Sequence, residues 1–189
     1  CETAQPDLIL MDMFMPNVDG IEATRRIMRT HPCPILVVTA SVRSSSGVVF
    51  EAMGAGALAV VATPPLEDQE GRQALLTKIA RLEQITSDCT PPARAVSQSP
   101  RNRIPGAVLI GSSAGGPAAL AEILGNLPTG FPSGIVIVQH MDERFTTELA
   151  TWLGSQSAIP VHPARSGDTV QPGIALLAAR EGHLICRRG

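Results

Sequence analysis

A serine between two glycines is the most distinctive chemical feature of this chain. Gly111-x-Ser113-x-Gly115 has the spacing of a nucleophile elbow, and it lies between an apolar run at residues 108–110 and a helical pattern at residues 117–124. Glycines relieve backbone crowding at such a strand-to-helix turn and leave the hydroxyl exposed. The first N–H groups of the helix have no partner within it and can stabilise an oxyanion. The pattern predicts acyl transfer at Ser113, with an ordinary Gly/Ser turn as the alternative.

A histidine at the end of the next apolar run supplies a candidate base for this serine. Residues 134–138 are apolar, and Gln139-His140 follow them. Ligand sites in open parallel sheets lie beyond the carboxyl ends of the strands, so Ser113 and His140 are expected on the same edge. Imidazole titrates near neutral pH and can take a proton from a hydroxyl. We therefore predict Ser113 as nucleophile and His140 as general base; weaker histidine candidates are His31, His162 and His183.

The front of the chain carries a second chemical pattern. Asp12 ends the apolar run at residues 6–11, and Thr39 lies at the end of the run at residues 34–38. A carboxylate and a hydroxyl at the ends of neighbouring parallel strands suit a phosphoryl group, because the carboxylate can attack it and the hydroxyl can bind an oxygen. Either residue alone is better explained as an ordinary part of a strand end.

The elements that would position these residues alternate along the chain. Continuous apolar runs separated by helical patterns are typical of parallel sheets buried on both faces, so we predict an α/β fold. The expected strands cover residues 6–12, 34–40, 58–62, 108–110, 134–140, 159–161 and 174–179, and the expected helices cover residues 21–28, 69–85, 117–124 and 146–153.

Composition excludes several classes of function. The net charge is −2 and only 17% of the residues are charged, so there is no basic surface for nucleic acid. No apolar run is long enough to span a bilayer, and membrane insertion is not expected. The four cysteines lack Cys-x-x-Cys spacing, which argues against zinc and against a disulfide scaffold. These features fit a cytoplasmic enzyme.

The second half of the chain resembles a known enzyme family. Residues 111–117 (Gly-Ser-Ser-Ala-Gly-Gly-Pro) and 137–141 (Ile-Val-Gln-His-Met) are similar to the catalytic domain of chemotaxis protein-glutamate methylesterases of the CheB type. The resemblance implies that Ser113 is the nucleophile and His140 the base. It also implies that methylated chemoreceptors are the substrate, that deamidation of receptor glutamine is a second activity, and that the esterase needs no cofactor. Ala114 stands where the family often has threonine. The family's acid lies further downstream, and we do not assign it to Asp168.

The first half resembles the receiver domain of two-component response regulators. Residues 12–20, from Asp12 to the Val-Asp-Gly turn, carry the specific match. The resemblance implies that Asp12 is the phosphoacceptor and a Mg²⁺ ligand, that Thr39 is the switch hydroxyl, and that a chemotaxis-type histidine kinase is a partner. Thr63 stands where the family has a lysine that binds the phosphoryl oxygens, so we expect weakened phosphorylation.

These resemblances predict a chain of two incomplete α/β domains. We expect a partial receiver domain at residues 1–85, a proline-rich linker at 86–105 and a partial methylesterase domain at 106–189. In family terms this is a truncated flavodoxin-like receiver followed by a truncated doubly wound esterase, so we expect a fragment of a longer enzyme. An incomplete receiver sheet would leave an open apolar edge.

Two other classes of function are compatible with parts of the sequence. The first is a catalytically silent receiver or regulatory module that docks a signalling partner, which Thr63 favours and the Ser113/His140 pair opposes. The second is a nucleotide-binding domain that uses the glycine-rich turn, but the chain lacks both the P-loop ending and the dinucleotide motif. Within the esterase interpretation, flagellar chemotaxis and a pathway controlling surface attachment through a diguanylate cyclase both remain open.

Overall fold

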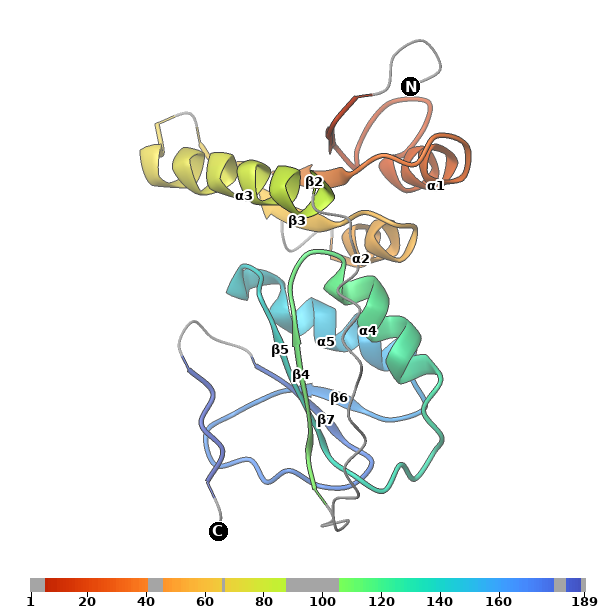
Figure 1. Ribbon diagram of the computed structural model, residues 1–189, viewed down its shortest axis with the longest axis vertical. Coiled ribbons are helices and arrows are strands. Elements are labelled where there is room, and N and C mark those ends of the chain that lie inside the picture. The colour runs from red at the N-terminus through yellow and green to blue at the C-terminus, as the bar shows by residue number, and fades with distance from the viewer. Residues whose placement is uncertain (1–5, 41–45, 66, 88–105, 179–182, 188–189) are drawn as a thin grey trace.

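The protein forms two parallel sheets, each associated with helices (Figure 1). We describe it from a computed structural model, in which residues 6–40, 46–65, 67–87, 106–178 and 183–187 are placed well enough to describe. The proline-rich linker predicted at 86–105 lies outside these residues, apart from the end of one helix. None of the helices in the described part combines the length and the apolar character needed to cross a bilayer.

The first sheet has three parallel strands in the order β1-β2-β3. Alternate side chains of β2 point to opposite faces. Ile35 and Val37 belong to a core that includes Phe50, whereas Leu36 packs with Leu82 on the other face. The elements of this half are β1 (Ile9–Met11), α1 (Gly20–Thr30), β2 (Ile35–Thr39), α2 (Ser46–Gly54), β3 (Ala59–Ala62) and α3 (Gln69–Ser87).

The second sheet has four parallel strands in the order β4-β5-β7-β6. Helix α4 connects β4 to β5, and a short 3₁₀ turn, η1, leads from β5 into α5. Parallel neighbours require such crossover connections, which place the ends of β4 and β5 at one edge. The elements are β4 (Val108–Ser112), α4 (Gly116–Gly125), β5 (Ile135–Gln139), η1 (Glu143–Phe145), α5 (Thr146–Ser155), β6 (Val161–Pro163) and β7 (Ala175–Leu177).

The predicted burial on both sheet faces applies to β2 but not to β4. Four of the five residues of β2 are buried, whereas Leu109 in β4 is 69% exposed and Val138 in β5 is 46% exposed. One face of β4 and β5 therefore presents apolar side chains in the described structure, although their sequence is as apolar as that of a fully covered strand. At the edge of the first sheet, Leu10 of β1 is also exposed.

Helix α2 joins the two halves into a continuous core. It packs against both α4 and α5, and buried residues of both sheets belong to one hydrophobic cluster. The ring of Phe50 in α2 stacks on Trp152 in α5, with centroids 5.8 Å apart and an interplanar angle of 27°. Figure 1 shows α2 between the first sheet and the helices of the second half.

The predicted ends of several elements differ from the structure; β1, for example, begins at Ile9 rather than at residue 6. The strand expected at 159–161 begins instead at Val161, because Pro160 has no N–H to donate to a ladder. The helix expected at 69–85 extends to Ser87. No helix was predicted for α2: its sequence has little amphipathic pattern, because it packs against elements of both halves.

Candidate active site

Ser113 lies in the turn between β4 and α4, as the elbow spacing predicted. The turn is tight: the N–H of Gly116 donates to the Ser113 carbonyl at 2.9 Å. Gly115 has φ 73°, in the left-handed region that favours glycine. By contrast, Gly111 lies within β4, and a Cβ added there would meet nothing within 4 Å. The turn geometry therefore requires the second glycine of the predicted motif and not the first.

The structure brings His140 to this turn. Ser112 pairs with Gln139 at the ends of β4 and β5, and the N–H of His140 donates to the Ser112 carbonyl at 2.9 Å. This register places both side chains at the carboxyl edge of the sheet. Ser113 Oγ lies 3.5 Å from His140 Nδ1, and both residues are exposed to solvent. Catalytic hydrogen bonds are often this long before substrate binds.

The ring atom that faces the serine determines the tautomer required for catalysis. A neutral imidazole can accept the Ser113 proton at Nδ1 only if its own proton is on Nε2. The Nε2–H would then be the atom available to an acid that orients the ring. If His140 is the base, Nδ1 is the ring atom placed to accept the Ser113 proton.

Asp168 does not lie in this arrangement. Its Oδ2 accepts a hydrogen bond from the Arg165 N–H at 2.8 Å, and its own N–H donates to the Arg165 carbonyl at 3.1 Å. The carboxylate therefore stabilises its own exposed turn after β6. The other histidines are also separate from the serine: His31 ends α1, His162 lies in β6 and His183 is exposed near the end of the chain.

Gln139 is a site residue that the sequence analysis did not assign. Its side chain links the two strand ends: Ser112 Oγ donates to Oε1 at 2.6 Å, and Nε2 donates to the Ser113 carbonyl at 2.8 Å. The available signal was its position at the end of the apolar run, directly before His140. Its partners, however, are 26 and 27 residues away and become neighbours only when β4 and β5 pair.

The first half of the chain contacts the same turn. The N–H of Gly115 donates to the carbonyl of Leu58 at 2.6 Å, and the Leu58 and Ala114 side chains belong to the same hydrophobic cluster. One of the N–H groups at the start of α4 is thus bound by a carbonyl that precedes β3. Among the described residues, nothing accepts a hydrogen bond from the Ala114 N–H.

An ion pair stabilises the segment that follows His140. Arg144 binds Asp142 through a 2.6 Å contact, and the hydrogen bonds from Arg144 hold the pKa of the Asp142 carboxyl below its usual range. Lys78 of α3 is near enough to Asp142 to contribute to this lowering. Burial lowers the pKa of Lys78 itself, and its ammonium donates to the Val60 carbonyl at 2.8 Å. Charged groups from both halves therefore meet beside the candidate base.

Asp12 directly follows β1 and Thr39 is the last residue of the neighbouring strand β2, so both lie at the carboxyl edge of the first sheet, where their predicted roles require them. Asp12 is exposed and its Oδ1 accepts from the Phe14 N–H at 3.2 Å, while Thr39 is buried. Thr63 lies beside them, because its N–H donates to the Thr39 carbonyl at 2.8 Å. The described residues contain no group of three acidic, histidine or cysteine side chains that could hold a metal ion. The role of Asp12 as a Mg²⁺ ligand stays a prediction.

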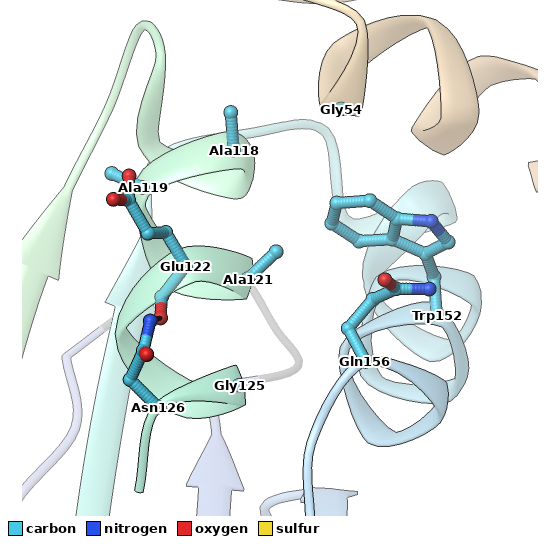
Figure 2. Close-up of a pocket in the computed structure, with 9 residues that line it drawn as sticks. All are labelled: Gly54, Ala118, Ala119, Ala121, Glu122, Gly125, Asn126, Trp152 and Gln156. Atoms are coloured by element: carbon cyan, nitrogen blue, oxygen red, sulfur yellow. Dashed lines mark hydrogen bonds between the residues drawn. The ribbon is translucent and has the colours of Figure 1, made fainter.

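A cavity of about 660 Å³ lies away from these residues, between α2, α4 and α5. Figure 2 shows Trp152 of α5 and Gln156, which directly follows α5, across the gap from Ala118 and Ala121 of α4, with Gly54 of α2 above them. Ser113 and His140 are not among its lining residues. Ser113 and His140 are themselves exposed at the carboxyl edge of the second sheet.

The fold and the site define a class: an α/β protein in which a receiver-like half precedes a serine-hydrolase-like half. Residues 1–84 match the model of the response regulator receiver domain, and residues 108–188 match that of the CheB methylesterase. The chain therefore belongs to the CheB-type family of response-regulator methylesterases.

Relatives with curated names cover the chain from end to end. It is 48% identical over 193 aligned positions to "Protein-glutamate methylesterase/protein-glutamine glutaminase 2" of Burkholderia orbicola (strain AU 1054), covering 100% of this chain and 58% of that protein. The protein of the same name from Burkholderia lata is 50% identical over 192 positions, covering 97% of this chain and 56% of that protein. The chain thus spans little more than half the length of these relatives.

Among solved structures, the crystal structure of the Thermotoga maritima CheB methylesterase catalytic domain is similar to part of the chain. The match has 44% sequence identity, covers 44% of each chain and has a TM-score of 0.43.

Proposed function

We propose that this chain is part of a protein-glutamate methylesterase, which hydrolyses glutamate γ-methyl esters on chemoreceptors and deamidates receptor glutamine. The observation that carries the proposal is the Ser113–His140 pair, 3.5 Å apart at the ends of adjacent parallel strands. The names of the Burkholderia relatives support both activities. Because the pair is exposed, a glutamate side chain on the surface of a folded receptor can reach it.

The reaction divides into two acyl-transfer steps. Ser113 Oγ attacks the ester carbonyl while His140 Nδ1 takes the hydroxyl proton, and the C–OCH₃ bond then breaks as His140 returns that proton to the leaving oxygen. Methanol leaves and a γ-glutamyl ester remains on Ser113. Water attacks this ester with His140 again accepting the proton, and the Ser113 oxygen recovers a proton as glutamate is released. For a glutamine substrate the first leaving group is ammonia.

Backbone donors at the start of α4 would stabilise the oxyanion formed in each step. In a nucleophile elbow the N–H of the residue after the serine supplies one donor, which is Ala114 here. Removal of one such donor in a serine protease lowers kcat by about 10²–10³-fold. The Ala114 N–H therefore accounts for a large part of the rate in this proposal.

The receiver half is proposed to regulate this site. Phosphorylation of Asp12 by a chemotaxis-type histidine kinase, in the presence of Mg²⁺, would change the surface that supplies the Leu58 carbonyl to the elbow. Thr39 would respond as the switch hydroxyl. Thr63 provides no ammonium group for the phosphoryl oxygens, so this coupling is expected to be weak.

The experiment that tests the proposed activity is methanol release from a methylated receptor by the full-length protein. We expect Ser113→Ala to lower the rate by several orders of magnitude, on the order of the 10⁶-fold loss seen when a triad serine is removed. Ser155→Ala is a matched control, because that exposed hydroxyl bonds to Trp152 and Gln156 at the end of α5 and not to the Ser113 turn. Unchanged release by Ser113→Ala would exclude Ser113 as the nucleophile.

A further inference from the structure

The carboxamide of Gln139 connects the strand that carries the base to the turn that carries the nucleophile. Its Oε1 accepts from Ser112 Oγ at 2.6 Å, and its Nε2 donates to the carbonyls of Ser113 at 2.8 Å and of His140 at 3.3 Å. A carbonyl oxygen only accepts hydrogen bonds, so the amide nitrogen must face Ser113. The two ends of the amide are therefore not interchangeable.

The packing around this amide leaves no room for a side chain at Gly116, the first residue of α4. A Cβ added to Gly116 would collide with Gln139 Oε1, and it would lie 2.9 Å from Ser112 Cβ. The start of α4 therefore lies directly against the Gln139 side chain. The Gly116 N–H donates to the same Ser113 carbonyl at 2.9 Å, so two donors from different elements hold one oxygen.

The orientation of the Ser113 carbonyl determines the direction of the Ala114 N–H. The peptide unit that joins these residues is planar and trans, so its C=O and N–H point in opposite directions. Because the two donors hold the Ser113 oxygen on the inner side of the turn, the Ala114 N–H points to the outer side. That N–H has no acceptor among the described residues.

We propose that Gln139 is a positioning residue of the active site, which holds the Ser113–Ala114 peptide plane so that the Ala114 N–H points at the developing oxyanion. This inference rests on the proposed esterase function. Gln139 does not touch the reacting atoms and acts through the backbone of the nucleophile. Its loss should affect the transition state more than substrate binding, because the oxyanion exists only after attack.

The test compares two nearly isosteric variants in the full-length protein. Gln139→Met removes both ends of the amide, and Gln139→Glu keeps an acceptor for Ser112 but places a carboxylate oxygen opposite the Ser113 carbonyl. We expect kcat for methanol release to fall about 10–100-fold in both variants, which is less than the loss caused by deleting an oxyanion donor outright. We expect KM to change less than about threefold. Gln156→Met, at an exposed glutamine directly after α5, is the matched control and should keep both constants.

Two further measurements separate positioning from loss of folded protein. Active-site titration by the burst of methanol in the first turnover counts competent serines, so kcat is expressed per folded site. Affinity for a boronic acid analogue of the glutamyl group, whose tetrahedral adduct carries the oxyanion, should weaken in parallel with kcat. If one variant does not fold, the other gives the comparison.

Wild-type kcat in a folded Gln139 variant would overturn the inference, as would a rise in KM alone. A loss of kcat of the expected size, with unchanged affinity for the boronic acid, would also overturn the inference, because the oxyanion donors would then be intact. The activity of Ser113→Ala decides the esterase function separately: an inactive Ser113→Ala beside a fully active Gln139→Met rejects only the role of Gln139.

Discussion

At the level of single residues, the imidazole of His140 presents Nδ1 to the serine and leaves Nε2 for an orienting partner. The backbone N–H of His140 is bound to the Ser112 carbonyl, so the position of the base is set by the strand register. The neighbouring Asp142–Arg144 pair stabilises the start of the next helical segment. These contacts fix the position of the His140 backbone beside Ser113.

The role of the base gives a prediction about pH. Only the neutral imidazole can accept the Ser113 proton, so the wild-type kcat/KM should fall as acid protonates His140. His140→Gln should lower the rate by several orders of magnitude and remove this acid limb. The measurement is kcat/KM for methanol release across the acid and neutral range, with His162→Gln as a control because that residue lies in β6. An unchanged acid limb in His140→Gln would assign the titration to another group.

At the level of elements, the elbow depends on two glycines that serve different purposes. Gly115 adopts the left-handed conformation that lets the chain turn from β4 into α4. Gly116 permits the first helical turn to lie against Gln139. Gly111, which completes the elbow motif in the sequence, has open space around it.

Because of this difference, alanine should be harmful at Gly116 and tolerated at Gly111. Gly116→Ala places a methyl group into Gln139 Oε1 and should destabilise the fold by about 1–3 kcal/mol, the usual cost of overpacking. It should also lower kcat, since α4 must move away from the turn. Gly111→Ala meets no neighbour and should change both quantities little. Urea unfolding and methanol release measure the two effects, and equal behaviour of the two variants would contradict this account of the elbow.

The same elements show what the sequence could reveal and what it could not. The apolar runs ending in Asp12, Thr39 and Gln139-His140 predicted the strands correctly, because buried parallel strands have a strong compositional signal. Helix α2 was missed because it packs against both halves and has no regular polar face. The exposed face of β4 was also missed, since an apolar run does not say which of its faces is covered.

For the site, the sequence predicted which chemistry Ser113 and His140 could perform and that they lie on one edge. It could not reveal the network around Gln139, because those contacts join residues that are distant along the chain and depend on the rotamer of one amide. The contact between Leu58 and Gly115 was inaccessible for a similar reason: it depends on how the two halves pack. The proximity of the two side chains was therefore predictable, whereas hydrogen-bond partners across elements were not.

At the level of the whole molecule, the two halves meet at the catalytic turn and at the Phe50–Trp152 stack. The stack lies between α2 and α5, whereas the Leu58 carbonyl binds the Gly115 N–H at the start of α4. Both contacts are made by the receiver half. Packing between the halves therefore affects the elbow directly.

Weakening this packing should expose the elbow. Trp152→Ala removes the partner of Phe50, so we expect faster amide hydrogen exchange at residues 113–116 and a higher basal rate of methanol release in the full-length protein. Phe14→Ala is a suitable control, because that aromatic ring is 60% exposed. Unchanged exchange at Gly115 in a folded Trp152→Ala variant would show that the Leu58 contact does not depend on the stack.

The most direct test of the central claim is to identify the atom that carries the acyl group. The full-length enzyme would be mixed with methylated receptor, quenched in acid during the first turnover and digested, and the peptide containing Ser112 and Ser113 analysed by tandem mass spectrometry. We predict a γ-glutamyl ester on Ser113, in an amount equal to the burst of methanol. Methanol release with the ester on Ser112, or with no ester on either serine at any time point, would contradict the account.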